Sequence, residues 1–219
     1  MTPSNPNQMR RALFAAVCVL PLALIARSAW RRWRAESEAG APLLPDTALA
    51  ETCTDTGESI ADLSHHAPVL LVFLRHAGCT FCREALADLA KQRGALERAG
   101  TRLVLVHMSD HASFREFAAS YGLGDVALVS DRARVLYRAL GLRRGTLAQL
   151  LGWRVLVRGF QAAIMERHGV GAIQGDSTQM PGVFLIRDGR VIAAHRHETA
   201  ADRPDYAAVC EINSNSERA

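Results

Sequence analysis

The sequence lacks the features of several common classes of protein. Five cysteines among 219 residues are too few, and odd in number, for a disulfide framework. No glycine-rich phosphate loop, Ser-His-Asp signature or internal repeat is present. Net charge is also missing from most of the chain: residues 1–40 hold six arginines and two acids, which leaves 20 basic and 20 acidic residues elsewhere. This neutral body argues against a nucleic-acid partner.

The N-terminal segment is the only long apolar run. Residues 12–26 are uncharged and mostly apolar, and extension to Trp30 gives the roughly 20 residues that a membrane-spanning helix needs. The arginine-rich stretch 31–34 would resist translocation. We therefore expect residues 1–34 to be an N-terminal hydrophobic helix that anchors the chain in a membrane, with the soluble domain cytoplasmic. A cleaved signal peptide, a surface-lying helix, a misassigned start and an extracytoplasmic location are the alternatives.

The remainder divides by composition. Residues 35–50 contain Gly40, Pro42 and Pro45 without a sustained period, which is typical of a linker. We expect a folded domain over 51–210 and a disordered tail over 211–219.

The order of elements in the folded domain predicts an α/β fold. Buried strands alternate with amphipathic helices, which indicates a central mixed sheet flanked by helices and closed by an antiparallel pair. We expect a hairpin over 51–63, strands over 69–74, 102–107 and 126–130, helices over 80–99, 113–122 and 131–140, a helical insertion over 142–173, and a hairpin over 183–195 that turns at Asp188-Gly189. The insertion has an apolar stripe that suits packing over the sheet or a homodimer surface, and its arginines also suit a membrane surface.

The chemistry centres on Cys79 and Cys82. They follow a buried strand and begin a helix, where N–H groups and the helix dipole stabilise a thiolate. Their spacing allows one thiol to attack a substrate while the other resolves the intermediate. Arg75, His76 and Arg83 flank the pair and add positive charge.

Metal binding is the main alternative for this pair. A Cys-x-x-Cys motif is often half of a zinc site, and the other ligands could come from Cys53, Cys210, His195 and His197. Because none of those four forms a second close-spaced cysteine pair, we favour redox chemistry and expect no metal or cofactor. A metallochaperone using one of the two histidines, and a membrane-tethered scaffold without catalysis, remain open. Cys53 and Cys210 are also candidate remote resolving thiols.

The stretch TDTGESIADLSHHAPVLLVFLRHAGCTFCREALADL resembles the opening of the redoxin superfamily, and MPGVFLI at 180–186 resembles its proline segment. This resemblance implies a thioredoxin-like fold in which Pro181 follows a cis peptide bond, faces the cysteine pair and shapes the substrate groove. We assign Arg75, Thr80 and Arg83 to the same groove as supporting residues.

More narrowly, FLRHAGCTFCRE, YRALGLRRGT and MPGVFLIRDGRVIAAHRH are similar to the peroxiredoxin-like branch of the alkyl hydroperoxide reductase/thiol-specific antioxidant family. The resemblance covers residues 51–207 and implies reduction of disulfides or hydroperoxides, with thioredoxin or a small thiol as electron donor. Two registers are possible. In the thioredoxin register, which we favour, Cys79 attacks and Cys82 resolves. In the peroxiredoxin register Cys82 is peroxidatic, and Cys79 occupies the place of the family's Thr or Ser.

Overall fold

The computed structural model describes residues 44–75, 79–146, 149–150, 155 and 176–210. The expected anchor over 1–34, the tail over 211–219 and most of the insertion over 142–173 lie outside these residues. Within the described part, no helix combines the length and the apolar character needed to cross a membrane.

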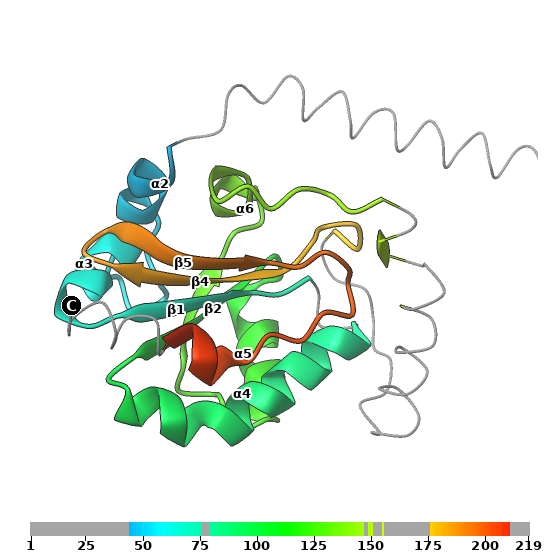
Figure 1. Cartoon of the computed structure of the whole chain (residues 1–219), viewed down its shortest axis with the longest axis horizontal. Helices are drawn as coiled ribbons and strands as arrows, with labels where there is room; N and C mark the ends of the chain where they lie inside the picture. Colours follow the sequence, from blue (N-terminus) through cyan, green and yellow to red (C-terminus); the bar gives the residue numbers. More distant parts are fainter. Residues whose placement is uncertain (1–43, 76–78, 147–148, 151–154, 156–175, 211–219) are drawn as a thin grey trace, which may run out of the picture. The chain divides into compact units, whose positions relative to one another are not determined.

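A five-stranded mixed sheet forms the centre of the domain (Figure 1). The strand order is β3-β2-β1-β4-β5, with β1 parallel to β2 and antiparallel to β4. All five residues of β1 are buried because helices cover both faces of the sheet. The strands are β1 (Val69–Phe73), β2 (Arg102–His107), β3 (Ala127–Ser130), β4 (Gly182–Arg187) and β5 (Arg190–Arg196).

The helices divide between the two faces of the sheet (Figure 1). One apolar core joins the sheet to α4 (Thr80–Arg98), α5 (His111–Ala119) and the helical residues 206–210. A second core, on the opposite face, joins it to α2 (Pro45–Glu51), α3 (Ile60–His66) and α6 (Val135–Ala139). The cysteine pair lies at the C-terminal ends of the parallel strands, because Cys79 follows β1 and begins α4.

Short-range signals account for several element boundaries. The side chains of Ser59 and Asp110 cap α3 and α5 by accepting hydrogen bonds from backbone N–H groups in the first helical turn. Asp188 and Gly189 both have positive φ values, 51° and 72°, in the turn between β4 and β5. Two successive positive φ values suit the right-handed twist of a tight hairpin. The prediction of this closing hairpin is therefore confirmed.

The N-terminal part of the domain differs from expectation. The predicted hairpin over 51–63 is reduced to one antiparallel bridge between Cys53 and Ser59, because α3 begins at Ile60 and buries its apolar side chains as a helix. Part of the predicted linker over 35–50 is also helical: α2 begins at Pro45 and buries Ala48 completely. These corrections move the start of the ordered domain upstream of residue 51.

Candidate active site

Cys79 occupies the N-cap of α4, directly after the loop that follows β1. Its carbonyl accepts hydrogen bonds from the N–H groups of Cys82 and Arg83, which form the first turn of the helix. Only 7% of Cys79 and 2% of Cys82 are exposed, and the pair is present in its dithiol form. The predicted junction between strand, cysteine pair and helix is thus present.

Four contacts stabilise the thiolate of Cys79. The Cys82 thiol donates a hydrogen bond to its sulfur, Arg75 provides a nearby positive charge, and the backbone N–H groups of Cys82 and Phe81 point at it. Burial acts in the opposite direction, because removal from water disfavours charge. The stabilising contacts prevail and lower the pKa of Cys79 from 9.0 to about 6. A substantial share of Cys79 is therefore ionised near neutral pH.

Arg75 links the cysteine pair to the loop that precedes β4. Its Nη1 lies 3.6 Å from the Cys79 sulfur, and its backbone N–H donates to the Cys82 sulfur over 3.2 Å. The rest of the guanidinium donates to the carbonyls of Ser177 and Gln179. Within the described part of the chain no carboxylate pairs with this buried cation. Since a buried charge is costly without a counter-charge, the Cys79 thiolate is its natural partner.

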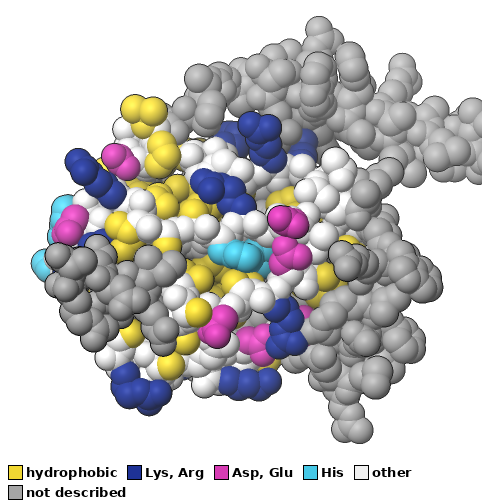
Figure 2. All heavy atoms as spheres, viewed as in Figure 1, with side chains coloured by type: hydrophobic (Ala, Val, Ile, Leu, Met, Phe, Trp, Pro, Cys, Tyr) yellow, Lys and Arg dark blue, Asp and Glu magenta, His cyan; other side chains and the backbone are white. Residues whose placement is uncertain are grey.

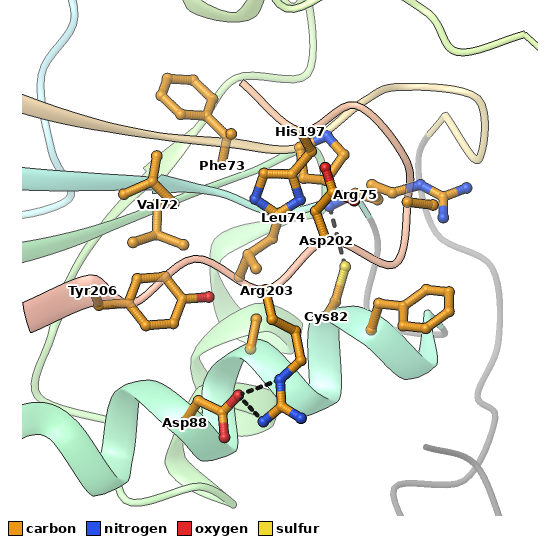
Figure 3. Close-up of a pocket in the computed structure, with 16 residues that line it drawn as sticks. Val72, Phe73, Leu74, Arg75, Cys82, Asp88, His197, Asp202, Arg203 and Tyr206 are labelled. Carbon is orange, nitrogen blue, oxygen red and sulfur yellow. Dashed lines mark hydrogen bonds and ion pairs between the residues drawn. The ribbon is translucent and has the colours of Figure 1, made fainter. Parts of the chain in front are cut away.

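Cys82 lines a small cavity beside the start of α4. The cavity has a volume of about 20 Å³, enough for one water molecule or a molecule of similar size. Figure 3 shows it between the start of α4 and the segment that follows β5. Its polar lining comes from Arg75, Cys82, Asp88, His197, Asp202, Arg203 and Tyr206.

Pro181 lies in the lining of the same cavity, as expected for a residue near the cysteine pair. The expected cis peptide bond is wrong: no cis bond occurs among the described residues, so the bond before Pro181 is trans. Met180 donates its N–H to the carbonyl of Arg143 and the Pro181 carbonyl accepts from His197, so neighbouring segments hold this turn on both sides.

Thr80 and Arg83 occupy different positions relative to the pair. Thr80 is the first residue of α4 and is partly exposed. The Arg83 guanidinium lies 5.6 Å from the centre of the Phe117 ring on α5. His76 lies outside the described residues. Arg75 is the cation whose charge contributes to the lowered pKa of Cys79.

The residues considered for metal binding do not form a site. His195 and His197 have ring centres 5.3 Å apart, but His195 is exposed while both ring nitrogens of His197 are buried. Over the ranges that the structure describes, no three histidine, cysteine or acidic side chains converge on one point. The metallochaperone alternative thus gains no support from the geometry.

Cys53 and Cys210 lie away from the pair. Cys210 is buried and hydrogen-bonds Thr101, which directly precedes β2, whereas Cys79 follows β1. Because β1 and β2 are parallel, these positions are at opposite ends of the strands. The backbone of Cys53 forms an isolated antiparallel β-bridge with Ser59, ahead of β1 in the sequence. Neither thiol is placed to resolve an intermediate on Cys79 within this fold.

Several residues around the pair carried no sequence signal. The carbonyls that accept hydrogen bonds from Arg75 come from residues about a hundred positions later in the sequence. Arg203 and Tyr206, which form one wall of the cavity, are also distant from the cysteine pair in the sequence. Glu84 is buried and pairs with Arg203 over 2.8 Å, which fixes that wall to α4. The described part of the insertion also reaches this region, since Leu150 and Val155 pack with Met180 and Phe81.

Sequence comparison identifies the relatives of this arrangement. The family model described as AhpC/TSA antioxidant enzyme matches residues 88–199, about half of the chain. The chain belongs to this family. Human peroxiredoxin-like 2C is 29% identical over 80% of this chain and 82% of its own length. Pig prostamide/prostaglandin F synthase is 29% identical over 61% of this chain and 67% of its own length. The match to the AhpC/TSA family model begins after Cys82. It therefore supports the assignment of the domain to this family and gives no information about the cysteine pair.

Solved structures of family members share the fold. Peroxiredoxin Q of Xanthomonas campestris superposes with a TM-score of 0.54 at 15% identity, covering 80% of this chain and 96% of its own. Peroxiredoxin 6 of Arenicola marina gives a TM-score of 0.52 at 14% identity, covering 75% of this chain and 69% of its own. At this identity the likeness establishes the thioredoxin-like fold alone.

Proposed function

We propose that this chain is a thiol-dependent oxidoreductase that reduces hydroperoxides or disulfides through Cys79 and Cys82. The observation that carries the proposal is the contact between Arg75 and Cys79, in which a buried cation with no carboxylate partner in the described part of the chain faces a thiol of lowered pKa. A stabilised thiolate at a helix N-terminus is the nucleophile that both reactions need. The peroxiredoxin-like antioxidant relatives make this chemistry the natural one for the site.

The same cysteine can act on either oxidant. With a hydroperoxide, the Cys79 thiolate attacks the terminal oxygen, the O–O bond breaks, and Cys79 becomes a sulfenic acid while an alcohol leaves after taking up a proton. With a disulfide, the thiolate forms a mixed disulfide and displaces one substrate thiolate. Cys79 is only 7% exposed, which favours small oxidants over protein disulfides.

Cys82 completes the cycle in both cases. Its sulfur attacks the Cys79 sulfur, which forms the Cys79–Cys82 disulfide and releases water from the sulfenic acid or the second thiol from the mixed disulfide. An external thiol or a thioredoxin then supplies two electrons that regenerate the dithiol. The lowered pKa of Cys79 and its greater exposure favour this assignment over the register in which Cys82 attacks.

A parallel assay with both oxidants tests the proposal. Reduced protein is mixed with hydrogen peroxide, an alkyl hydroperoxide or a small disulfide, and turnover is followed with dithiothreitol or thioredoxin as donor. We expect Cys79→Ser to abolish turnover, and Cys82→Ser to perform the first step and then stop with a modified Cys79 visible by mass spectrometry. Full turnover by Cys79→Ser would reject the proposal, and a first step that survives only with Cys82 intact would reverse the two roles.

A further inference from the structure

His197 presents a buried imidazole to the cavity that Cys82 lines. Both ring nitrogens are buried, and neither has a hydrogen-bond partner among the residues that the structure describes. A neutral imidazole carries one N–H donor and one lone pair, and burial of both without partners is unfavourable unless another group uses them. In Figure 3 the ring lies beside the same pocket as the Cys82 sulfur, with Asp202 next to it, while the Arg203 side chain extends toward Asp88.

The resolving step creates a need for a proton acceptor at this place. In the resting dithiol, the Cys82 proton is hydrogen-bonded to the Cys79 sulfur. Once Cys79 has reacted, its sulfur is no longer anionic and cannot hold that proton. Cys82 must nevertheless lose it to attack, since the thiolate is the nucleophile. The backbone N–H of Arg75, which points at the Cys82 sulfur, stabilises the resulting charge but cannot accept a proton.

The other polar groups that line the cavity are unsuited to accept it. Asp88 is engaged by Arg203, and Asp202 accepts hydrogen bonds from the backbone and side chain of Thr199. The two arginines carry no lone pair that can take a proton at neutral pH. Burial raises the pKa of Tyr206 above its ordinary value, so its hydroxyl stays a proton donor.

We propose that His197 accepts the proton of Cys82 as that cysteine attacks Cys79. The proton moves from the Cys82 sulfur to a ring nitrogen, directly or through one water in the cavity, while the Cys79–Cys82 bond forms and the second substrate thiolate or hydroxide leaves. The imidazolium then gives the proton to that leaving group or to solvent, so atoms and charges balance. This inference rests on the proposed function, in which Cys79 attacks first.

The surroundings of His197 keep its ring neutral at rest and allow it to carry a proton for a short time. Burial, with a smaller contribution from His195, lowers the pKa of His197 to about 4, so the ring is neutral and able to accept a proton at rest. Asp202 acts in the opposite direction and faces the imidazolium once it forms. From α4, Glu84 and Asp88 both pair with Arg203, and Lys91 lies 3.7 Å from Asp88, so two cations balance the two carboxylates on that side.

A two-phase reaction with 5,5′-dithiobis(2-nitrobenzoic acid) separates the two steps. The full chain is used with Cys18, Cys53 and Cys210 replaced by serine, so that only the pair reacts. Attack by Cys79 releases the first coloured thiolate, and attack by Cys82 releases the second. For His197→Asn we expect an unchanged first phase and a second phase slowed about 100-fold near neutral pH, in the range of general-base effects.

The pH dependence of the second phase distinguishes proton transfer from a structural role. In the parent chain we expect a rate that is flat from about pH 6 to 8, because His197 is neutral throughout this range. In His197→Asn we expect a rate that rises about tenfold per pH unit, because hydroxide must remove the proton. His195→Asn, a matched change on the exposed neighbouring ring, serves as control and should match the parent.

The outcomes separate the two proposals. A normal first phase with an unchanged second phase in both His197→Asn and His197→Gln rejects the role of His197 alone. A first phase that is absent, or that persists in Cys79→Ser, rejects the proposed function and this inference with it. Near-ultraviolet circular dichroism and thermal unfolding of each variant identify any loss of folding, and the pH profile of the parent chain then tests the inference by itself: a rate that rises with pH across the range overturns it.

Discussion

The guanidinium of Arg75 lies 3.6 Å from the sulfur of Cys79 and within hydrogen-bond distance of two carbonyls from the loop before β4. A single side chain thus connects the thiol of lowered pKa to the segment that contains Pro181. The carbonyls that accept hydrogen bonds from Arg75 fix the position of its guanidinium. They therefore also fix the distance over which the charge of Arg75 acts on Cys79.

Replacement of Arg75 should weaken the nucleophile. In Arg75→Met the pKa of Cys79 rises toward its ordinary range, and alkylation by iodoacetamide near neutral pH becomes roughly tenfold slower because less thiolate is present. Arg83→Met removes the same charge from a residue that packs over Phe117, so it is the matched control and should alkylate at the parent rate. Equal rates in the parent and Arg75→Met would show that Arg75 does not stabilise the thiolate.

The stability of the reduced protein should depend on pH through Cys79. Its pKa is about 6 in the folded protein against an ordinary value of 9.0, so between these pH values the unfolded chain binds more protons and stability rises with pH. The contribution is complete above about pH 9, is lost as pH falls through 6, and is at most about 4 kcal/mol.

Denaturant unfolding under reducing conditions measures this effect. The difference in free energy of unfolding between the parent and Cys79→Ser should grow from pH 6 to 9, since serine does not ionise in that range. Cys210→Ser makes the same chemical change at a thiol whose pKa is raised by burial, and its difference from the parent should show no such rise. A flat difference for Cys79→Ser would contradict the lowered pKa.

The remote thiols should be dispensable for turnover. We expect the double variant Cys53→Ser/Cys210→Ser to keep its rate with peroxide or disulfide within about twofold of the parent, because Cys210 lies at the far end of the parallel strands and Cys53 pairs with Ser59 ahead of β1. Some loss of thermal stability is expected from buried Cys210. A loss of turnover comparable to that of Cys82→Ser would show that one of these thiols resolves the intermediate.

Asp131 should stabilise the fold without affecting the thiols. Its carboxylate accepts hydrogen bonds from the N–H groups of Val135, Leu136 and Tyr137, and Tyr137 donates its hydroxyl to the carbonyl of Leu74 at the end of β1. Asp131→Ala should lower the free energy of unfolding by about 2 kcal/mol. Asp110→Ala removes an exposed cap from α5 and should cost less. Equal effects would show that burial adds nothing to the cap at Asp131.

The order of strands and helices followed from local patterns. A continuous apolar run over 69–74 is typical of a strand buried on both faces, and β1 is buried along its whole length. The helix after Cys79 and the hairpin at Asp188-Gly189 were predictable for the same reason: helical spacing, cap preference and positive φ depend on residues within a few positions of one another. The segment 45–51 was missed because Pro45 and the surrounding small residues favour a linker, and α2 is stabilised by burying Ala48 and Leu49 in the second core.

The sequence by itself determined that Cys79 and Cys82 stand at the junction of a buried strand and a helix, since both elements and the spacing between the cysteines are local. Only the tertiary structure decided which groups surround them. Arg75 is held by a carbonyl 104 positions away, and His197 reaches the cavity because β5 ends beside Pro181. Such contacts depend on how the strands are ordered in the sheet, and no local spacing encodes that order.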